Sequence, residues 1–139
     1  MITNEQLTKR VNELALEKWG VRFSLPCEIV KNLNANGMFS AEFDGYGKIK
    51  PIGMKISYNL MQYYPKDIID GVILHELCHW ILLLQGKPNG DEDIEFFIEM
   101  EKVGGLFTLE ISIRNLRIIS KARRCKYKCL KNQICIGYM

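Results

Sequence analysis

The sequence predicts an α+β fold in which helices pack on a short, mainly antiparallel sheet. Three observations support this fold class. A stripe of apolar residues at helical spacing begins the chain, several short β-like runs follow it, and a long apolar segment without strand-like alternation comes next. With 47% apolar and 25% charged residues, the chain has the composition of a soluble globular protein with room for a core.

An N-terminal helix is expected up to about Trp19. Thr3 or Asn4 can cap its start, and Gly20 supplies the stop because glycine readily adopts the left-handed conformation that ends helices. The apolar residues recur at helical spacing, so they share one face: Leu7, Val11, Leu14 and Ala15.

The region from residue 21 to residue 58 predicts the sheet. Two segments rich in turn-forming residues, NANG and DGYGK, separate its β-like runs. These runs are VRFSLPCEIV, MFSAEF and IGMKISY.

Two helices are expected after the sheet. The first begins near Pro65, contains IIDGVILHELCHWILLLQ, and stops at Gly86 and Pro88; it is apolar nearly all round, so it should be buried. The second follows DEDIEFFIEMEKV and ends at Gly104, with acidic residues near its start, where the helix dipole favours them. Its core face is expected to contain Phe96, Phe97 and Met100.

The C-terminal part forms a short basic tail that the alternation of Phe107, Leu109, Ile111 and Ile113 predicts to be β-rich. Residues 111–139 carry 8 Lys or Arg and no Asp or Glu, whereas residues 1–110 carry 11 basic and 16 acidic residues. A basic tail favours binding to DNA or another polyanion, because it neutralises phosphates; a solvated terminal segment is the alternative. The candidate nucleic-acid contacts are Lys121, Arg123, Arg124, Lys126, Lys128 and Lys131.

The cysteines and the apolar segments indicate in which cellular compartment the protein is expected. Cys27 and Cys78 each stand alone in an apolar segment, where a reduced, buried thiol is the ordinary interpretation. No apolar run reaches the length of a spanning helix, and the polar start MITNEQLTKR does not resemble a signal peptide. We therefore expect a cytoplasmic protein with no membrane partner.

The segment HELCHW holds the chain's two histidines and predicts a metal site. His75 and His79 are four residues apart, so both imidazoles project from one helix face and can hold one ion. Glu76 beside them would accept the proton of a water that the ion activates. The alternative is a chance match, but two histidines and a glutamate in so apolar a helix would be costly to bury without a partner such as a cation.

A catalytic zinc site needs a third protein ligand, and no other histidine exists in the chain. Cys78 points elsewhere on the helix, so an acidic cluster downstream is the better source. The stretch QGKPNG lets the chain turn back and bring the start of the second helix to the metal. The cluster consists of Asp91, Asp93, Glu95 and Glu99.

From about Leu7 to Gly105 the chain resembles the SprT-like zinc metalloproteases, a family that includes Spartan, and bacterial members look closest. The resemblance rests on MKISYNLM, VILHELCHW, GKPNGDEDIEFF and KVGG. It implies a small zincin-like domain over residues 1–105 and a C-terminal extension over residues 106–139.

The resemblance also implies the roles of the site residues. One zinc ion would be held by His75, His79 and Asp91, where Asp91 stands at the position of the family's usual third histidine; Glu95 is the alternative ligand. Glu76 would be the general base for hydrolysis of peptide bonds. Many bacterial members end in a zinc ribbon, of which Cys125, Cys129 and Cys135 look like a degenerate remnant, because a closed site needs four ligands.

The leading function is thus a zinc metallopeptidase acting on a protein or peptide, with DNA-associated proteins as candidate substrates. Extended substrate is expected along an edge strand near residues 55–57, with Tyr58, Tyr63 or Tyr64 as candidates for stabilising the oxyanion. The alternative is a catalytically weak or inactive zinc-containing protein that binds nucleic acid or has a regulatory role. A third hypothesis is a regulatory protease that cuts one dedicated partner.

Overall fold

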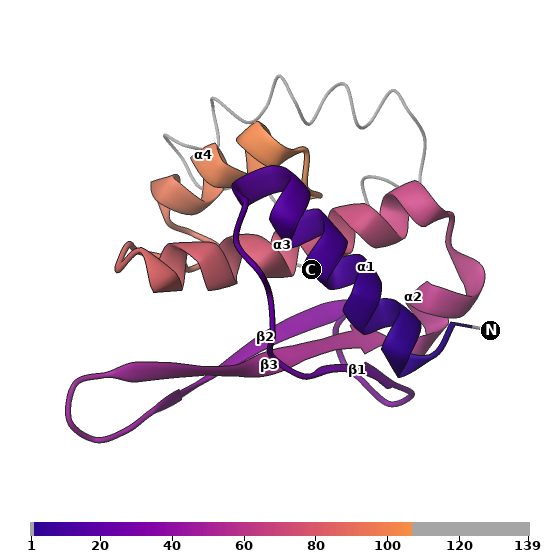
Figure 1. The fold of residues 1–139 in the computed structure, drawn as a ribbon, viewed down its shortest axis with the longest axis horizontal. Coiled ribbons are helices and arrows are strands. Elements are labelled where there is room, and N and C mark those ends of the chain that lie inside the picture. The colour runs from indigo at the N-terminus through magenta and orange to yellow at the C-terminus, as the bar shows by residue number, and fades with distance from the viewer. Residues whose placement is uncertain (1, 107–139) are drawn as a thin grey trace.

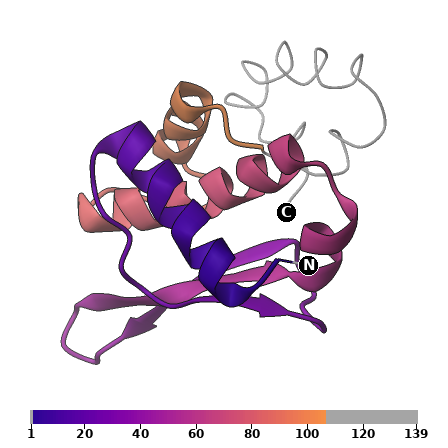
Figure 2. The same ribbon diagram turned by 45° about the vertical axis from the view of Figure 1, so that its right-hand side comes forward.

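The computed structural model describes residues 2–106, and these form an α+β domain, as predicted. Helices α1 and α3 lie side by side over one face of the sheet, and α4 packs against α3 (Figures 1 and 2). The elements are α1 (Asn4–Trp19), β1 (Cys27–Val30), β2 (Gly37–Phe43), β3 (Ile49–Ser57), α2 (Tyr58–Tyr63), α3 (Lys66–Leu84) and α4 (Ile94–Val103).

The sheet is mixed and has the strand order β1-β3-β2. Strand β2 pairs antiparallel with β3, as expected, whereas β1 pairs parallel with β3. The antiparallel pairing joins seven residue pairs and the parallel pairing four, so the sheet is mainly antiparallel, as predicted. The parallel pairing of β1 was not predicted; it arises because β3 inserts between β1 and β2 and runs in the same direction as β1.

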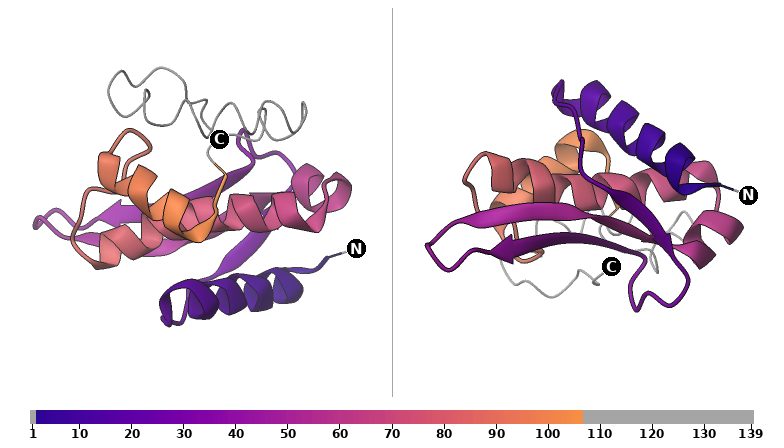
Figure 3. Two further views of the ribbon diagram at one scale, coloured as in Figure 1. Left: turned by 90° about the horizontal axis from the view of Figure 1, so that it is seen from above. Right: turned by 60° about the horizontal axis from the view of Figure 1, so that its bottom comes forward.

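The strand order also shows that the predicted substrate edge was wrong. Lys55 of β3 pairs with Glu28 on one side and with Met38 on the other, so residues 55–57 lie in the centre of the sheet. Among the described residues, the edge beside α3 is β2. The β2–β3 hairpin extends past the end of the helices (Figure 1), and Figure 3 shows it from above and from below.

Local hydrogen bonds explain where several elements begin and end. Thr3 caps α1 in a capping box with Gln6, and Gly20 ends the helix with φ of 66°. Ser57 ends β3, because its side chain accepts from the N–H of Leu60 and starts α2, a short helix that was not predicted.

The last helix starts later than predicted. Helix α4 begins at Ile94, with Asp93 at the N-cap position, so Asp91 lies in the preceding loop. Because Asp91 lies in a loop, its position is not fixed by helical geometry, and its side chain can reach residues that a side chain on α4 could not.

The core lies between the helices and the sheet, and α3 contributes more buried residues to it than any other element, as its apolar sequence predicts. Two polar contacts join α3 and α4 to α1. Arg10 makes two hydrogen bonds to Asp70, of 2.9 and 2.6 Å, and the indole N–H of Trp19 donates to Glu99 at 2.8 Å. No helix among residues 2–106 is long and apolar enough to cross a membrane.

Candidate metal centre

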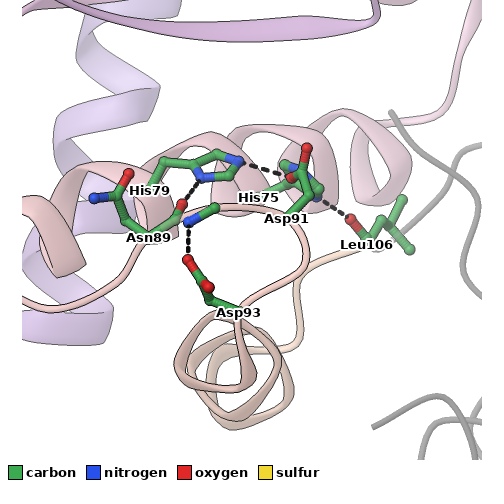
Figure 4. Close-up of polar contacts among 7 residues, drawn as sticks. His75, His79, Asn89, Asp91, Asp93 and Leu106 are labelled. Atoms are coloured by element: carbon green, nitrogen blue, oxygen red, sulfur yellow. Dashed lines mark hydrogen bonds and ion pairs between the residues drawn. The ribbon is translucent and has the colours of Figure 1, made fainter. Parts of the chain in front are cut away.

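Two turns of α3 and the loop before α4 bring three side chains to one point. The Nε2 atoms of His75 and His79 lie 3.1 and 3.0 Å from the same oxygen, Oδ1 of Asp91 (Figure 4). One ligand atom from each residue lies within 4.8 Å of those of the other two. Of the four acidic residues in the predicted cluster, Asp91 is the one in this group, and Glu95 is not part of it.

Backbone carbonyls orient both imidazoles. Nδ1 of His75 lies 2.7 Å from the carbonyl oxygen of Leu106, and Nδ1 of His79 is paired with the carbonyl oxygen of Asn89. When Nδ1–H donates to a carbonyl, Nε2 carries the lone pair, which is the arrangement that a metal-binding histidine needs. Both Nε2 atoms then point toward the Asp91 carboxylate, where a metal ion would replace the proton that forms the hydrogen bond in the metal-free protein.

Packing restricts the two rings further. The ring of Phe96 on α4 stacks on His79, with centroids 4.3 Å apart, and meets His75 edge-on at 4.9 Å. Phe96 was predicted only as a core residue, and it also holds both imidazoles in place.

The position of Asp91 depends on a tight loop. The carboxylate of Asp93 accepts from the N–H of Gly90 at 2.8 Å, and the N–H of Asp93 donates to the carbonyl of Gly90 at 3.0 Å. These bonds close the loop around Asp91. Asp93 therefore acts on the site by shaping this loop.

Close packing at Gly71 allows the contact between Leu106 and His75. A Cβ atom at Gly71 would lie 2.5 Å from Cγ of Leu106, so a larger residue would displace Leu106. The N–H of Leu106 donates to the carbonyl of Gly71, and the Leu106 carbonyl then reaches His75. A glycine inside a buried helix thus serves to bring a distant carbonyl to a ligand.

Glu76 is nearly fully buried, with 4% of its surface exposed, beside the histidines. Burial raises its pKa, while the nearby His75 and His79 and the N–H of Phe39, which donates to the carboxylate, oppose the shift. A Cβ atom at Gly37 would lie 3.1 Å from both Cγ and Oε2 of Glu76, so a larger residue there would press on the Glu76 side chain.

The pKa shifts of the trio formed by His75, His79 and Asp91 are those of a site that binds a proton or a cation. Hydrogen bonds from His75 and His79 hold the pKa of Asp91 well below its usual range, against the effect of burial. Burial lowers the pKa of His79, but the hydrogen bond with Asp91, the charge of Glu76 and the Asn89 carbonyl together raise it. The metal-free trio thus needs a shared proton, whose place a metal ion can take.

The donor set fits a metal ion. Two imidazole nitrogens and a carboxylate oxygen form a three-ligand set that zinc accepts, with a fourth position left for water or substrate. The side chain of Asp91 is 40% exposed, so the ligands can be reached from solvent. A pocket of about 440 Å³ opens over the trio, and its lining also includes Glu76. The trio could therefore hold a metal ion.

Some predicted site features lie elsewhere. Tyr58, Tyr63 and Tyr64 do not line the pocket, and Tyr63 is 75% exposed. The tail lies outside the described residues, together with Cys125, Cys129, Cys135 and the six predicted nucleic-acid contacts: Lys121, Arg123, Arg124, Lys126, Lys128 and Lys131.

The two described cysteines are both free and buried, as expected. Burial raises the pKa of Cys27 to about 11, and it also raises that of Cys78, which is not part of the metal-binding group. Both thiols should therefore stay protonated and unreactive.

Comparison with known proteins shows which family this chain is similar to. The SprT-like family matches residues 5–115. "Protein SprT-like" of Staphylococcus aureus strain MRSA252 is 30% identical over 103 residues, and that of strain JH9 is 29% identical. The matched region covers 74% of this chain and 64% of each relative, so it spans less than two thirds of their length. No solved structure matches the chain.

Proposed function

The chain belongs to the SprT-like family, and we propose that it is a zinc-dependent peptidase in which Glu76 is the general base. The observation that carries the proposal is the convergence of His75, His79 and Asp91 on one point, with the buried carboxylate of Glu76 beside it. A structural histidine pair would not need to share one carboxylate oxygen at the floor of an open pocket.

The residues divide the work of peptide hydrolysis. Zinc, when bound, supplies a Lewis acid that activates water and polarises a carbonyl group. Glu76 takes the proton from the attacking water and delivers it to the leaving amine; its burial, which raises its pKa, suits it to both transfers. Leu106 and Asn89 keep the two imidazoles in the ligand tautomer.

We propose that the substrate is an extended polypeptide that lies along β2. This strand is at the sheet edge beside α3, and its residues Gly37, Met38, Phe39 and Ala41 line the pocket with the metal-binding group. Pairing with an edge strand reads the backbone, so it suits a peptidase that accepts varied sequences. This assignment replaces the expected site at residues 55–57.

A matched pair of substitutions tests the peptidase. Glu76→Gln should keep about one zinc per chain and lose cleavage of an unfolded protein substrate, because the amide cannot accept the proton. The control Glu95→Gln changes an acidic residue of α4 outside the trio and should keep both properties. Cleavage retained in Glu76→Gln would contradict the mechanism, and zinc lost in Glu95→Gln would restore Glu95 as a ligand.

A second candidate is a zinc protein that binds nucleic acid and has weak or no peptidase activity. The charge of residues 111–139 favours it, with 8 basic residues and no acidic one. DNA binding should then weaken steeply with salt, and truncation after Ser120 should abolish that dependence. A flat salt dependence in the full chain would remove this candidate. Nucleic-acid binding by itself would not exclude the peptidase, because the substrates of a peptidase can be DNA-associated proteins; loss of cleavage together with steep DNA binding would favour the second candidate.

A further inference from the structure

The pocket over the metal-binding group has a second half that the proposed mechanism does not use. Leu83 lies one turn after His79 on the same face of α3, and it lines the pocket with Ala41 of β2 and Ile49 of β3. All of the ionisable lining residues belong to the metal centre: His75, Glu76, His79 and Asp91. The pocket is therefore polar at the metal and apolar beyond His79.

The hairpin provides the wall of this apolar half. Side chains alternate along a strand, and the register shift between Ser40 and Ala41 places its extra residue on β3, so the alternation of β2 continues. Gly37, which faces Glu76, therefore shares its face of β2 with Phe39, Ala41 and Phe43. Ile49 pairs with Phe43 across the hairpin and lies on the same face. This wall therefore runs without a charged side chain from Glu76 outward.

Large apolar side chains on this wall remain in contact with solvent. Phe43 is 65% exposed and Ile49 is 51% exposed. A single exposed apolar residue needs no explanation, but neighbouring ones that extend a functional pocket indicate a binding surface. An apolar group bound here would remove that surface from water.

The size of the pocket limits what can enter. Its volume of about 440 Å³ is that of a small-molecule site. One or two residues of a polypeptide fit such a space, whereas a folded domain does not. A charged side chain would lose hydration there without gaining a partner.

We propose that the space between Ala41, Ile49 and Leu83 is a specificity subsite for an apolar side chain of the substrate, adjacent to the bond that is cleaved. The inference rests on the proposed peptidase function and names its substrate class: extended segments with aliphatic or aromatic residues at the cleavage site. Such segments are exposed in unfolded proteins and buried in folded ones.

The test measures binding, so it does not depend on turnover. The probes are peptide hydroxamates with one backbone that carry leucine, phenylalanine, alanine or aspartate next to the metal-chelating group. Their affinities for the zinc-loaded full chain are measured by calorimetry. The leucine compound should bind about tenfold or more tighter than the aspartate compound.

Three variants locate the preference. Ile49→Lys should abolish it, because an ammonium group in the wall favours the aspartate compound. Ala41→Leu should weaken binding of the leucine and phenylalanine compounds and spare the alanine compound, because it fills the space. Ile52→Lys is the matched control: Ile52 is 41% exposed on the same strand but does not line the pocket, so the preference should remain. Zinc content and thermal unfolding verify that each variant is folded.

The outcomes separate this inference from the proposed function. Equal binding of the leucine and aspartate compounds, or an unchanged preference in Ile49→Lys, would overturn the subsite even if peptides are cleaved. A leucine preference that Ile49→Lys removes, in a protein that cleaves no peptide, would support the subsite and refute the peptidase.

Discussion

Two polar clusters lie against α3, and they are built differently. Arg10 and Asp70 form a pair of opposite charges with two hydrogen bonds, so each group satisfies the other. At the metal centre, both histidines use Nδ1 for backbone carbonyls and point Nε2 at one carboxylate oxygen of Asp91. The first cluster is complete by itself, whereas the second is complete only with a proton or a cation.

This difference predicts that substitutions in the metal centre affect function, whereas substitutions in the Arg10–Asp70 pair affect only stability. Contacts that satisfy each other contribute to the free energy of unfolding. Groups that converge on a point without satisfying each other contribute to ligand binding. The two clusters share one helix, so they can be compared in the same protein.

The largest expected effect is on zinc affinity in Asp91→Ala. Loss of a direct ligand should lower the affinity by more than the roughly 10–100-fold that is typical of losing an outer-shell partner. Asp91→His, which restores a nitrogen donor, should retain zinc. Zinc titration against a competing chelator measures both. Unchanged affinity in Asp91→Ala would show that the third ligand lies elsewhere.

A smaller effect is expected from Gly37→Ala, which crowds Glu76 without touching a ligand. The new Cβ would lie 3.0 Å from Cγ1 of Val72 and 3.1 Å from Oε2 of Glu76. We expect kcat to fall by about 10- to 100-fold through displacement of the base, with KM and zinc content little changed. Ser40→Ala on the same strand is the control and should keep full activity. An unchanged kcat in Gly37→Ala would mean that the base tolerates displacement.

Substitutions in the Arg10–Asp70 pair should lower the free energy of unfolding modestly and leave zinc binding unchanged. Both side chains are partly exposed, at 31% for Arg10 and 20% for Asp70, so solvent screens the pair. A double-mutant cycle of Arg10→Ala and Asp70→Ala should give a coupling of about 1 kcal/mol in urea unfolding. Zinc affinity should stay the same in all three variants, and a change would show that the clusters are coupled through α3.

The last comparison is the pH response of the metal-free protein. The folded-state pKa of His79 is raised and that of Asp91 is lowered. The raised pKa contributes stability that is lost as pH rises through it, and the lowered pKa contributes stability that is lost as pH falls through it. The metal-free protein should therefore be most stable between the two values.

NMR can test this directly, because the chain has only two histidines. The imidazole signal of His79 should titrate above its ordinary pKa of about 6.5. Asp91→Asn should move that pKa downward, since burial alone lowers it. An unchanged titration in Asp91→Asn would contradict the assigned contact.

Local interactions made much of this protein predictable from its sequence. The helical period alone places His75 and His79 on one face of α3, with Glu76 next to them. The capping box at Thr3 and the left-handed Gly20 set the limits of α1 within a few residues of chain. These features depend on residues that are neighbours in the sequence, so the sequence alone determined them. The family resemblance rests on the same local motifs.

Contacts between distant segments decided the rest. Insertion of β3 between β1 and β2 set the strand order and moved the candidate substrate edge to β2. The residue types alone left four acidic candidates open and the family resemblance favoured Asp91; the loop before α4 is what brings Asp91, and not Glu95, to the histidines. Leu106, 31 residues after His75, supplies the carbonyl that orients its ring. The sequence alone could not show these contacts, because each depends on the packing of segments that lie far apart in the chain.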